Sequence, residues 1–147
     1  MLGGPSVAYR YNLVGVRVLL VSADPAVRET MALAVRGVRR ILDPGQDVEF
    51  LQASDGVSGI ARAWRDRPDV VVADEIASRA GAFALAKDLT GAVPPFEGRI
   101  VILLDRPQDR WLARWSGADA RFSKPVNPYE LADAVAGFMT PGEKETA

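Results

Sequence analysis

Two uninterrupted apolar runs, each followed by an aspartate, constrain the fold of this 147-residue chain more than any other feature. The runs cover residues 70–73 and 100–104, and they are followed by Asp74 and Asp105. A strand with one face in water alternates apolar and polar residues, whereas a strand buried on both faces needs no alternation. Both runs are therefore expected to be central strands of a parallel sheet with helices on each side.

The rest of the chain alternates strand-like and helix-like segments around these two runs. Asp24 and Asn127 are expected to cap the first and last helices, residues 43–45 (Asp-Pro-Gly) to end the first, and residues 55–56 to form a turn. The predicted strands are 16–22, 48–51, 69–74, 100–104 and 120–123, and the predicted helices are 25–42, 57–65, 81–89, 108–116 and 128–139. The pattern predicts an α/β domain with five parallel strands and five helices.

The length fits one domain, which we expect at residues 16–139. Residues 1–15 carry Gly, Pro and polar residues without a sustained period and are predicted to be a flexible arm. Residues 140–147 are predicted to be a polar tail, so the sequence is expected to form a stand-alone domain.

Composition excludes several kinds of chemistry. The chain has no cysteine and no histidine, which excludes disulfides, thiol nucleophiles and Ser-His-Asp triads. Eighteen basic and nineteen acidic residues give a net charge of −1, which argues against bulk affinity for nucleic acid or anionic membranes. No apolar run approaches the ~20 residues that span a bilayer, no signal pattern is present, and the lack of cysteine suits the cytoplasm.

Polar residues follow several predicted strands at the point where each strand ends. The first strand ends at Ser22, Ala23 and Asp24, the third at Asp74, the fourth at Asp105 and the fifth at Lys124. In an open α/β sheet, ligands bind outside the carboxyl ends of the strands. We therefore expect Asp74, Asp105 and Lys124 to lie on one rim of the sheet, where the buried Asp74 carboxylate needs a partner.

Four segments give the chain a resemblance to the response-regulator receiver domain of two-component signalling. They are VRVLLVSADPAVRETM, PDVVVADEIAS, RIVILLD and GADARFSKPVNPYEL, and with ASDG they span about residues 16–139. The match of GAD…KP followed by NPYEL is the most specific. The resemblance implies the flavodoxin-like, doubly wound fold with strand order 2-1-3-4-5.

The resemblance also implies roles for individual residues. Asp74 matches the phosphoacceptor aspartate of the family, and Lys124 matches the lysine that contacts the phosphoryl group. The Lys124–Pro125 peptide bond matches one that is usually cis. Asp24 matches the third residue of the acidic cluster that follows strand one, although a plain helix cap explains it equally well.

The chain departs from the family at several of these positions. Ser22 and Ala23 replace the two acids that position Mg²⁺, which leaves only Asp24 and Asp74 as candidate ligands and predicts weak Mg²⁺ binding. Asp105 replaces the hydroxyl residue that donates to a phosphoryl oxygen, and Arg121 replaces the aromatic switch residue. Asp105 is an acceptor only, and it is expected to accept from Lys124 or from an inward Arg121.

These departures predict an atypical receiver, a signalling and binding module that is at most self-phosphorylated on Asp74. The alternative is a phosphorylation-competent receiver served by a histidine kinase or a small phosphodonor. A flavodoxin-like enzyme is disfavoured because SADPAV, not a Gly-rich loop, follows strand one. Direct DNA binding is disfavoured because no helix-turn-helix remains unassigned.

Trp111 and Trp115 are four residues apart and share one face of a short predicted helix. Such a pair is commonly core packing, and Arg121 by itself is commonly a solvated surface residue. In receiver domains, however, this helix, the fifth strand and the last helix form the usual partner surface, and Trp and Arg are enriched at interface cores. We expect the surface around Trp111, Trp115 and Arg121 to bind another signalling protein or a second copy of the chain.

Overall fold

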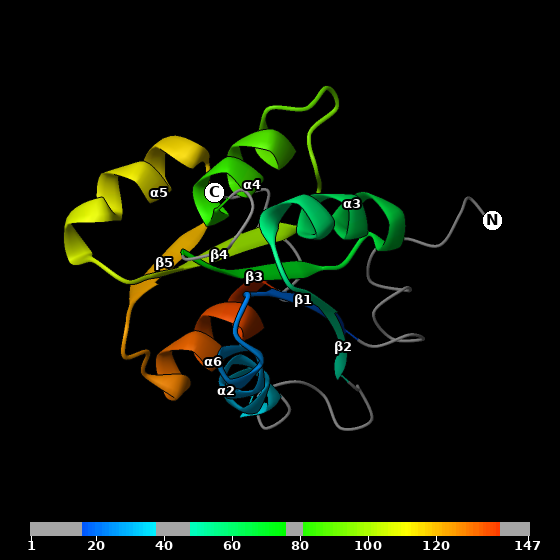
Figure 1. The fold of residues 1–147 in the computed structure, drawn as a ribbon. Helices are drawn as coiled ribbons and strands as arrows, with labels where there is room; N and C mark the ends of the chain where they lie inside the picture. Colours follow the sequence, from blue (N-terminus) through cyan, green and yellow to red (C-terminus); the bar gives the residue numbers. More distant parts are fainter. Residues whose placement is uncertain (1–15, 38–47, 76–80, 139–147) are drawn as a thin grey trace.

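The computed structural model describes residues 16–37, 48–75 and 81–138 as a five-stranded sheet between two layers of helices (Figure 1). The strands are β1 (Val16–Val21), β2 (Val48–Ala53), β3 (Val70–Asp74), β4 (Arg99–Leu104) and β5 (Ala120–Ser123). The helices are α2 (Pro25–Arg36), α3 (Gly56–Asp66), α4 (Ala82–Thr90), α5 (Arg110–Ser116) and α6 (Pro128–Phe138), with a 3₁₀ turn, η2 (Pro107–Asp109), before α5. The predicted arm and tail lie outside the described residues.

All neighbouring strands pair in parallel, in the order β2-β1-β3-β4-β5. This confirms the doubly wound topology that the sequence predicts. Asp74 lies opposite Leu103 in the β3–β4 register, and Leu104 lies opposite Ser123 in the β4–β5 register. The residues that follow these strands therefore emerge together at one edge of the sheet.

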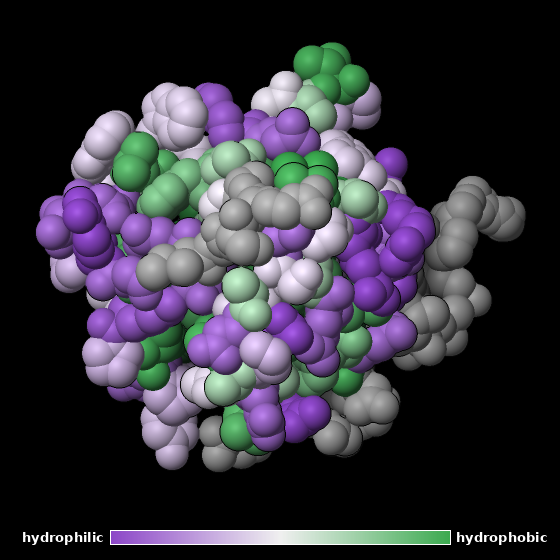
Figure 2. All heavy atoms as spheres, viewed as in Figure 1, coloured by the Kyte–Doolittle hydropathy of each residue, from purple (hydrophilic) through white to green (hydrophobic). Residues whose placement is uncertain are grey.

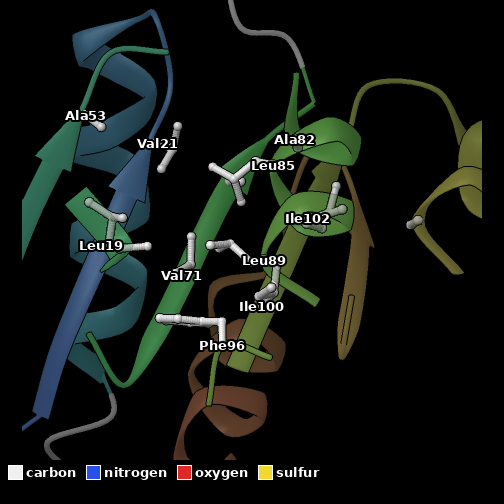
Figure 3. Packing of buried hydrophobic residues seen from close by; sticks show 14 of the residues in the cluster. Leu19, Val21, Ala53, Val71, Ala82, Leu85, Leu89, Phe96, Ile100 and Ile102 are labelled. Atoms are coloured by element: carbon white, nitrogen blue, oxygen red, sulfur yellow. The ribbon is translucent and has the colours of Figure 1, made fainter. Parts of the chain in front are cut away.

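The sheet has a hydrophobic cluster on each face. Helices α2 and α6 pack together on one face, while α3, α4 and α5 cover the other (Figure 1). Figure 3 shows the second cluster, in which Leu85 and Leu89 of α4 lie against Val71 and Ile102 of the central strands. Residues 70–73 and 100–102 are all buried, as expected for strands covered on both faces.

Several local predictions hold. Asp24 caps α2 by accepting the N–H of Ala26 at 2.9 Å, and Asn127 accepts the N–H groups of Tyr129 and Glu130 at the start of α6. The Lys124–Pro125 peptide bond is cis. The structure gives α2 from Pro25 to Arg36. The predicted end of this helix at residues 43–45 lies outside the described residues.

One predicted turn and one predicted helix were wrong. Residues 55–56 do not form an isolated turn, because Asp55 is the N-cap of α3 and accepts the N–H of Ser58 at 2.8 Å. Residues 108–116 do not form one helix: Pro107 opens a 3₁₀ turn, and the α-helical hydrogen bonding begins at Arg110. Strand β2 also continues to Ala53, beyond the predicted end at residue 51.

Candidate functional site

The carboxyl edge of the sheet brings together Ser22, Asp74, Asp105 and Lys124. Each residue ends or directly follows a different strand, β1, β3, β4 or β5. The predicted rim therefore exists, and Asp74, Asp105 and Lys124 are joined by ion pairs.

Asp74 is the most deeply buried charge at this rim, with a side chain only 5% exposed. Its Oδ1 accepts a hydrogen bond from Lys124 Nζ, and its Oδ2 accepts one from Ser22 Oγ at 2.9 Å. A buried carboxylate needs such partners because the unpaired ion would lose its hydration without compensation. Ser22, which is fully buried, thus acts as a hydrogen-bond donor to the Asp74 carboxylate.

Lys124 contacts two carboxylates at once. Its Nζ lies 2.7 Å from Asp105 Oδ1, in addition to its contact with Asp74. Burial by itself would lower the pKa of Lys124, but the hydrogen bonds that its ammonium donates to Asp105 and Asp74 outweigh burial and raise the pKa above its ordinary value. The ammonium therefore stays charged and bridges the ends of β3, β4 and β5.

Asp105 is held through both its side chain and its backbone. Its Oδ1 pairs with Lys124, while its Oδ2 is buried without a hydrogen-bond partner among the described residues. The Asp105 N–H donates to Glu75 Oε1 at 2.8 Å. Of the two pairings that the sequence left open for Asp105, the structure contains the one with Lys124.

Glu75 and Asp109 belong to this site, although the sequence analysis did not single them out. Burial raises the pKa of the Glu75 carboxyl, and the neighbouring Asp109 carboxyl raises it further, while the backbone N–H of Asp105 opposes the rise. Asp109 is buried and pairs with Arg106 at 3.2 Å. The available signal was Glu75 directly after Asp74, at the carboxyl end of an apolar strand.

The oxygen atoms around Asp74 that could coordinate a metal ion fit magnesium poorly. Both Asp74 oxygens already accept hydrogen bonds, and the Asp24 carboxylate caps α2. The Asp24 N–H donates to Ser22 Oγ at 3.1 Å. No three acidic side chains within residues 16–37, 48–75 and 81–138 converge as metal ligands. Mg²⁺ prefers several oxygen ligands in near-octahedral geometry, and one engaged carboxylate does not supply them.

Arg121 is half-buried on β5, and its Nε lacks a hydrogen-bond partner among the described residues. Its backbone lies opposite Ile102 in the sheet. The resemblance to receiver domains implies an aromatic residue at this position, where this chain has a cationic one.

Both tryptophans of α5 are exposed, Trp111 by 63% and Trp115 by 55%. The interpretation of this pair as core packing is therefore wrong. Lys87 of α4 places its Nζ 4.7 Å from the centre of the Trp115 ring, a cation–π contact. The indole pair is thus an exposed aromatic surface on α5, with Lys87 of α4 beside it. Figure 2 shows purple, pale and green side chains mixed over the face of the molecule that it draws.

Comparison with known proteins assigns the family. No model of a known protein family matches the chain. An uncharacterized response regulatory protein of Mycobacterium tuberculosis is 30% identical over 127 residues, which are 84% of this chain and 90% of that protein. The chain belongs to the response-regulator receiver family. Its receiver fold also matches solved structures.

Two of these structures are receiver domains of different contexts. The receiver domain of a Francisella response regulator is 21% identical with a TM-score of 0.70, over 90% of this chain and all (100%) of that one. The receiver domain of a Pseudomonas aeruginosa sensor histidine kinase, solved with magnesium in its active-site cleft, is 17% identical with a TM-score of 0.71. That match covers 86% of this receiver and 98% of the other chain. Among the described helices of this receiver, none has the length and apolar character to span a membrane.

Proposed function

We propose that this protein is an atypical receiver that signals through protein–protein contacts, with weak or no phosphorylation of Asp74. The observation that carries the proposal is the ion pair between Asp105 Oδ1 and Lys124 Nζ at 2.7 Å. Asp105 occupies the position of a phosphoryl-contacting hydroxyl and supplies a negative charge to the lysine that would meet the phosphoryl group. The receiver is thereby held in one state without a phosphoryl group.

The electrostatics of phosphoryl transfer support this proposal. In the reaction with acetyl phosphate, an Asp74 oxygen forms a bond to phosphorus, the bond to the acetate oxygen breaks, and acetate leaves. Such transfer depends on positioning and on neutralising the charge of the phosphoryl oxygens. An ionised Asp105 is an acceptor only, and two like charges ~4 Å apart repel by about 4 kcal/mol at an effective dielectric constant of ~20.

The proposal assigns a role to each site residue. Asp74 is the phosphoacceptor position, Lys124 the phosphoryl-contacting lysine, Asp105 the constitutive anion and Arg121 the substitute for the aromatic switch. Any Mg²⁺ held by Asp74, with or without Asp24, would be weakly bound, because both acids already make hydrogen bonds.

The partner surface in this proposal is the one formed by Trp111, Trp115 and Arg121. Two exposed indoles within one turn, with Lys87 stacked on Trp115, support binding to another signalling protein or a second copy. The proposal involves residues 16–139, no direct binding to nucleic acid or membrane, and a cytoplasmic location, in keeping with the absence of cysteine.

A phosphorylation-competent receiver in a histidine-kinase phosphorelay is the second candidate. Two observations favour it: Asp74 and Lys124 are in contact, and an apolar groove of about 510 Å³ adjoins Lys124. The groove lies between α2 and the start of α6 and includes Met31, Leu33 and Val126. A helical surface of a kinase seated there would bring its phosphohistidine to the rim beside Asp74.

Mass spectrometry after incubation with Mg²⁺ and acetyl phosphate separates the two candidates. The atypical receiver shows little or no mass gain of one phosphoryl group under conditions that label a phosphorylation-competent receiver. A stoichiometric gain that disappears in Asp74→Ala would establish the second candidate instead. Ser78→Ala is a suitable control because it removes a hydroxyl four residues after Asp74 in the sequence and leaves Asp74 itself unchanged.

A further inference from the structure

The residue directly after the phosphoacceptor position links β3 to the turn that carries Asp105. The Glu75 N–H donates to Leu103 O at 2.9 Å, which extends the β3–β4 ladder by one hydrogen bond. The Glu75 carboxylate then accepts the N–H of Asp105 at 2.8 Å. The first N–H of the turn between β4 and η2 is thus held by a side chain at the end of β3, and the backbone N–H of Arg106 also lowers the pKa of that side chain.

The surroundings of Glu75 make this contact costly to lose. Burial and the adjacent Asp109 carboxyl both disfavour the charged form of Glu75 and raise its pKa, and the backbone N–H groups oppose this rise only in part. Arg106 pairs with Asp109 at 3.2 Å, so the same turn holds the second acid in place. Hydrogen bonds from backbone N–H groups to a carboxylate are stronger than neutral ones, so Glu75 is a specific anchor for this turn.

We propose that Glu75 is a positioning residue that fixes the backbone of Asp105 so that the Asp105 carboxylate lies on Lys124. Asp105 follows the end of β4 at Leu104, and its N–H donates to the Glu75 side chain rather than to the backbone of a neighbouring strand. With the Glu75 anchor, Oδ1 meets Lys124 while Oδ2 stays buried with no hydrogen-bond partner in the described part of the chain. An unpartnered buried oxygen gains hydration when it turns outward, so without Glu75 the Asp105 side chain leaves Lys124.

The inference rests on the proposed function, in which Asp105 restrains phosphorylation of Asp74, and it names the residue on which that restraint depends. The Glu75 hydrogen bond also joins the end of β3 to the segment that leads through η2 into α5, the helix that carries Trp111 and Trp115.

The test compares Glu75→Ala, which removes the acceptor, with Glu75→Gln, which keeps a side-chain oxygen for the same N–H groups. Glu29→Ala, at an exposed position of α2, is the matched control. Amide hydrogen exchange of Asp105 and Arg106, followed by NMR, reports the anchor directly. We expect exchange at least tenfold faster in Glu75→Ala and changed less than threefold in Glu75→Gln and Glu29→Ala. Unchanged protection in a folded Glu75→Ala protein overturns the inference.

A double-mutant cycle distinguishes positioning from a general structural role. The rate of Asp74 labelling by acetyl phosphate is measured for Glu75→Ala, Asp105→Ala and the double variant. We expect Glu75→Ala to raise the rate severalfold in the parent and to leave it unchanged when Asp105 is already alanine. An equal effect in both backgrounds overturns the inference, because Glu75 would then act independently of Asp105.

The two proposals fail in different ways. If Asp105→Ala alone does not raise the labelling rate, the proposed restraint by Asp105 is wrong. The amide exchange of Asp105 and Arg106, with rescue by Glu75→Gln, then still decides whether Glu75 holds the turn.

Discussion

Asp105 Oδ1 lies 2.7 Å from Lys124 Nζ, in an ion pair that shares the lysine with Asp74, which ends the strand on the other side of β4 in the strand order. The lysine at the end of β5 thus bridges the ends of β3 and β4. Its side chain keeps 27% of its surface exposed and that of Asp105 keeps 24%, so solvent screens the pair in part. The charge balance of the rim is two carboxylates to one ammonium before any phosphoryl group arrives.

Replacing Asp105 by threonine is expected to raise the rate of Asp74 labelling by acetyl phosphate. The substitution removes the competing anion from Lys124 and restores a hydroxyl donor for a phosphoryl oxygen. A tenfold gain would correspond to about 1.4 kcal/mol of barrier. Labelling is measured by the mass gain over time. Asp105→Asn is the control, since it removes the charge without adding a hydroxyl, and an unchanged rate in both variants would refute the restraint.

Magnesium is expected to bind this receiver weakly. Ser22 Oγ already donates to Asp74 Oδ2, and Ala23 offers no side-chain ligand. Titration calorimetry should give no saturable heat at millimolar Mg²⁺, while the double substitution Ser22→Asp and Ala23→Asp should strengthen binding by restoring two oxygen ligands. A sub-millimolar dissociation constant for the parent would show that Asp24 and Asp74 suffice, contrary to this prediction.

The sequence predicted the sheet well because burial on both faces leaves a simple mark. Residues 70–73 and 100–104 are continuous apolar runs, and parallel pairing then places Asp74 and Asp105 at the same edge. Glu75 was not predicted, because its partner Asp105 is 30 residues away and the contact depends on the path of the chain after β4. No periodicity records that path.

The exposed state of Trp111 and Trp115 was also beyond the sequence pattern. An i, i+4 pair of indoles shares one helix face whether that face is inward or outward. In the structure Asp109, Ala113 and Ser116 form the buried side of this segment, which turns both indoles outward. The short 3₁₀ turn that begins at Pro107 precedes α5 and carries Asp109, and the sequence analysis placed a single helix there.

The alkaline stability of the fold should depend on Lys124. Its pKa is raised in the folded protein, so its contribution to stability is fully present below the unfolded pKa of about 10.4 and is lost as pH rises through the folded pKa. Urea unfolding is measured between about pH 9 and pH 12. Lys124→Arg keeps its charge over this range and should lose less stability than the parent. Parallel curves for parent and variant would contradict the assignment.

The N-cap of α3 is expected to contribute measurably to stability. Asp55 Oδ1 accepts the Ser58 N–H at 2.8 Å and the Ser58 hydroxyl at 2.9 Å. Asp55→Ala should lower the free energy of unfolding by about 1 kcal/mol, whereas Asp55→Asn, which also caps helices, should lower it by much less. Denaturant unfolding measures both, and equal losses would show that charge rather than capping matters at this position.

The exposed indoles of α5 are expected to mediate association. Trp111→Ala and Trp115→Ala should change the free energy of unfolding by about 0.5 kcal/mol or less, because both side chains are largely solvent-exposed. Either substitution should nevertheless weaken self-association, or affinity for an identified partner, by about tenfold or more, as expected of an aromatic interface core. Arg121→Ala is expected to weaken the same association because it removes the positive charge.

Sedimentation equilibrium over a range of concentrations measures self-association for all three variants. Tyr129→Ala, an exposed aromatic substitution on α6, is the matched control. If the unsubstituted protein remains monomeric at every concentration, a second copy of the chain is not the partner of this surface. Affinities for an identified partner that are equal in parent, Trp111→Ala and Trp115→Ala would remove the aromatic surface from the interface altogether.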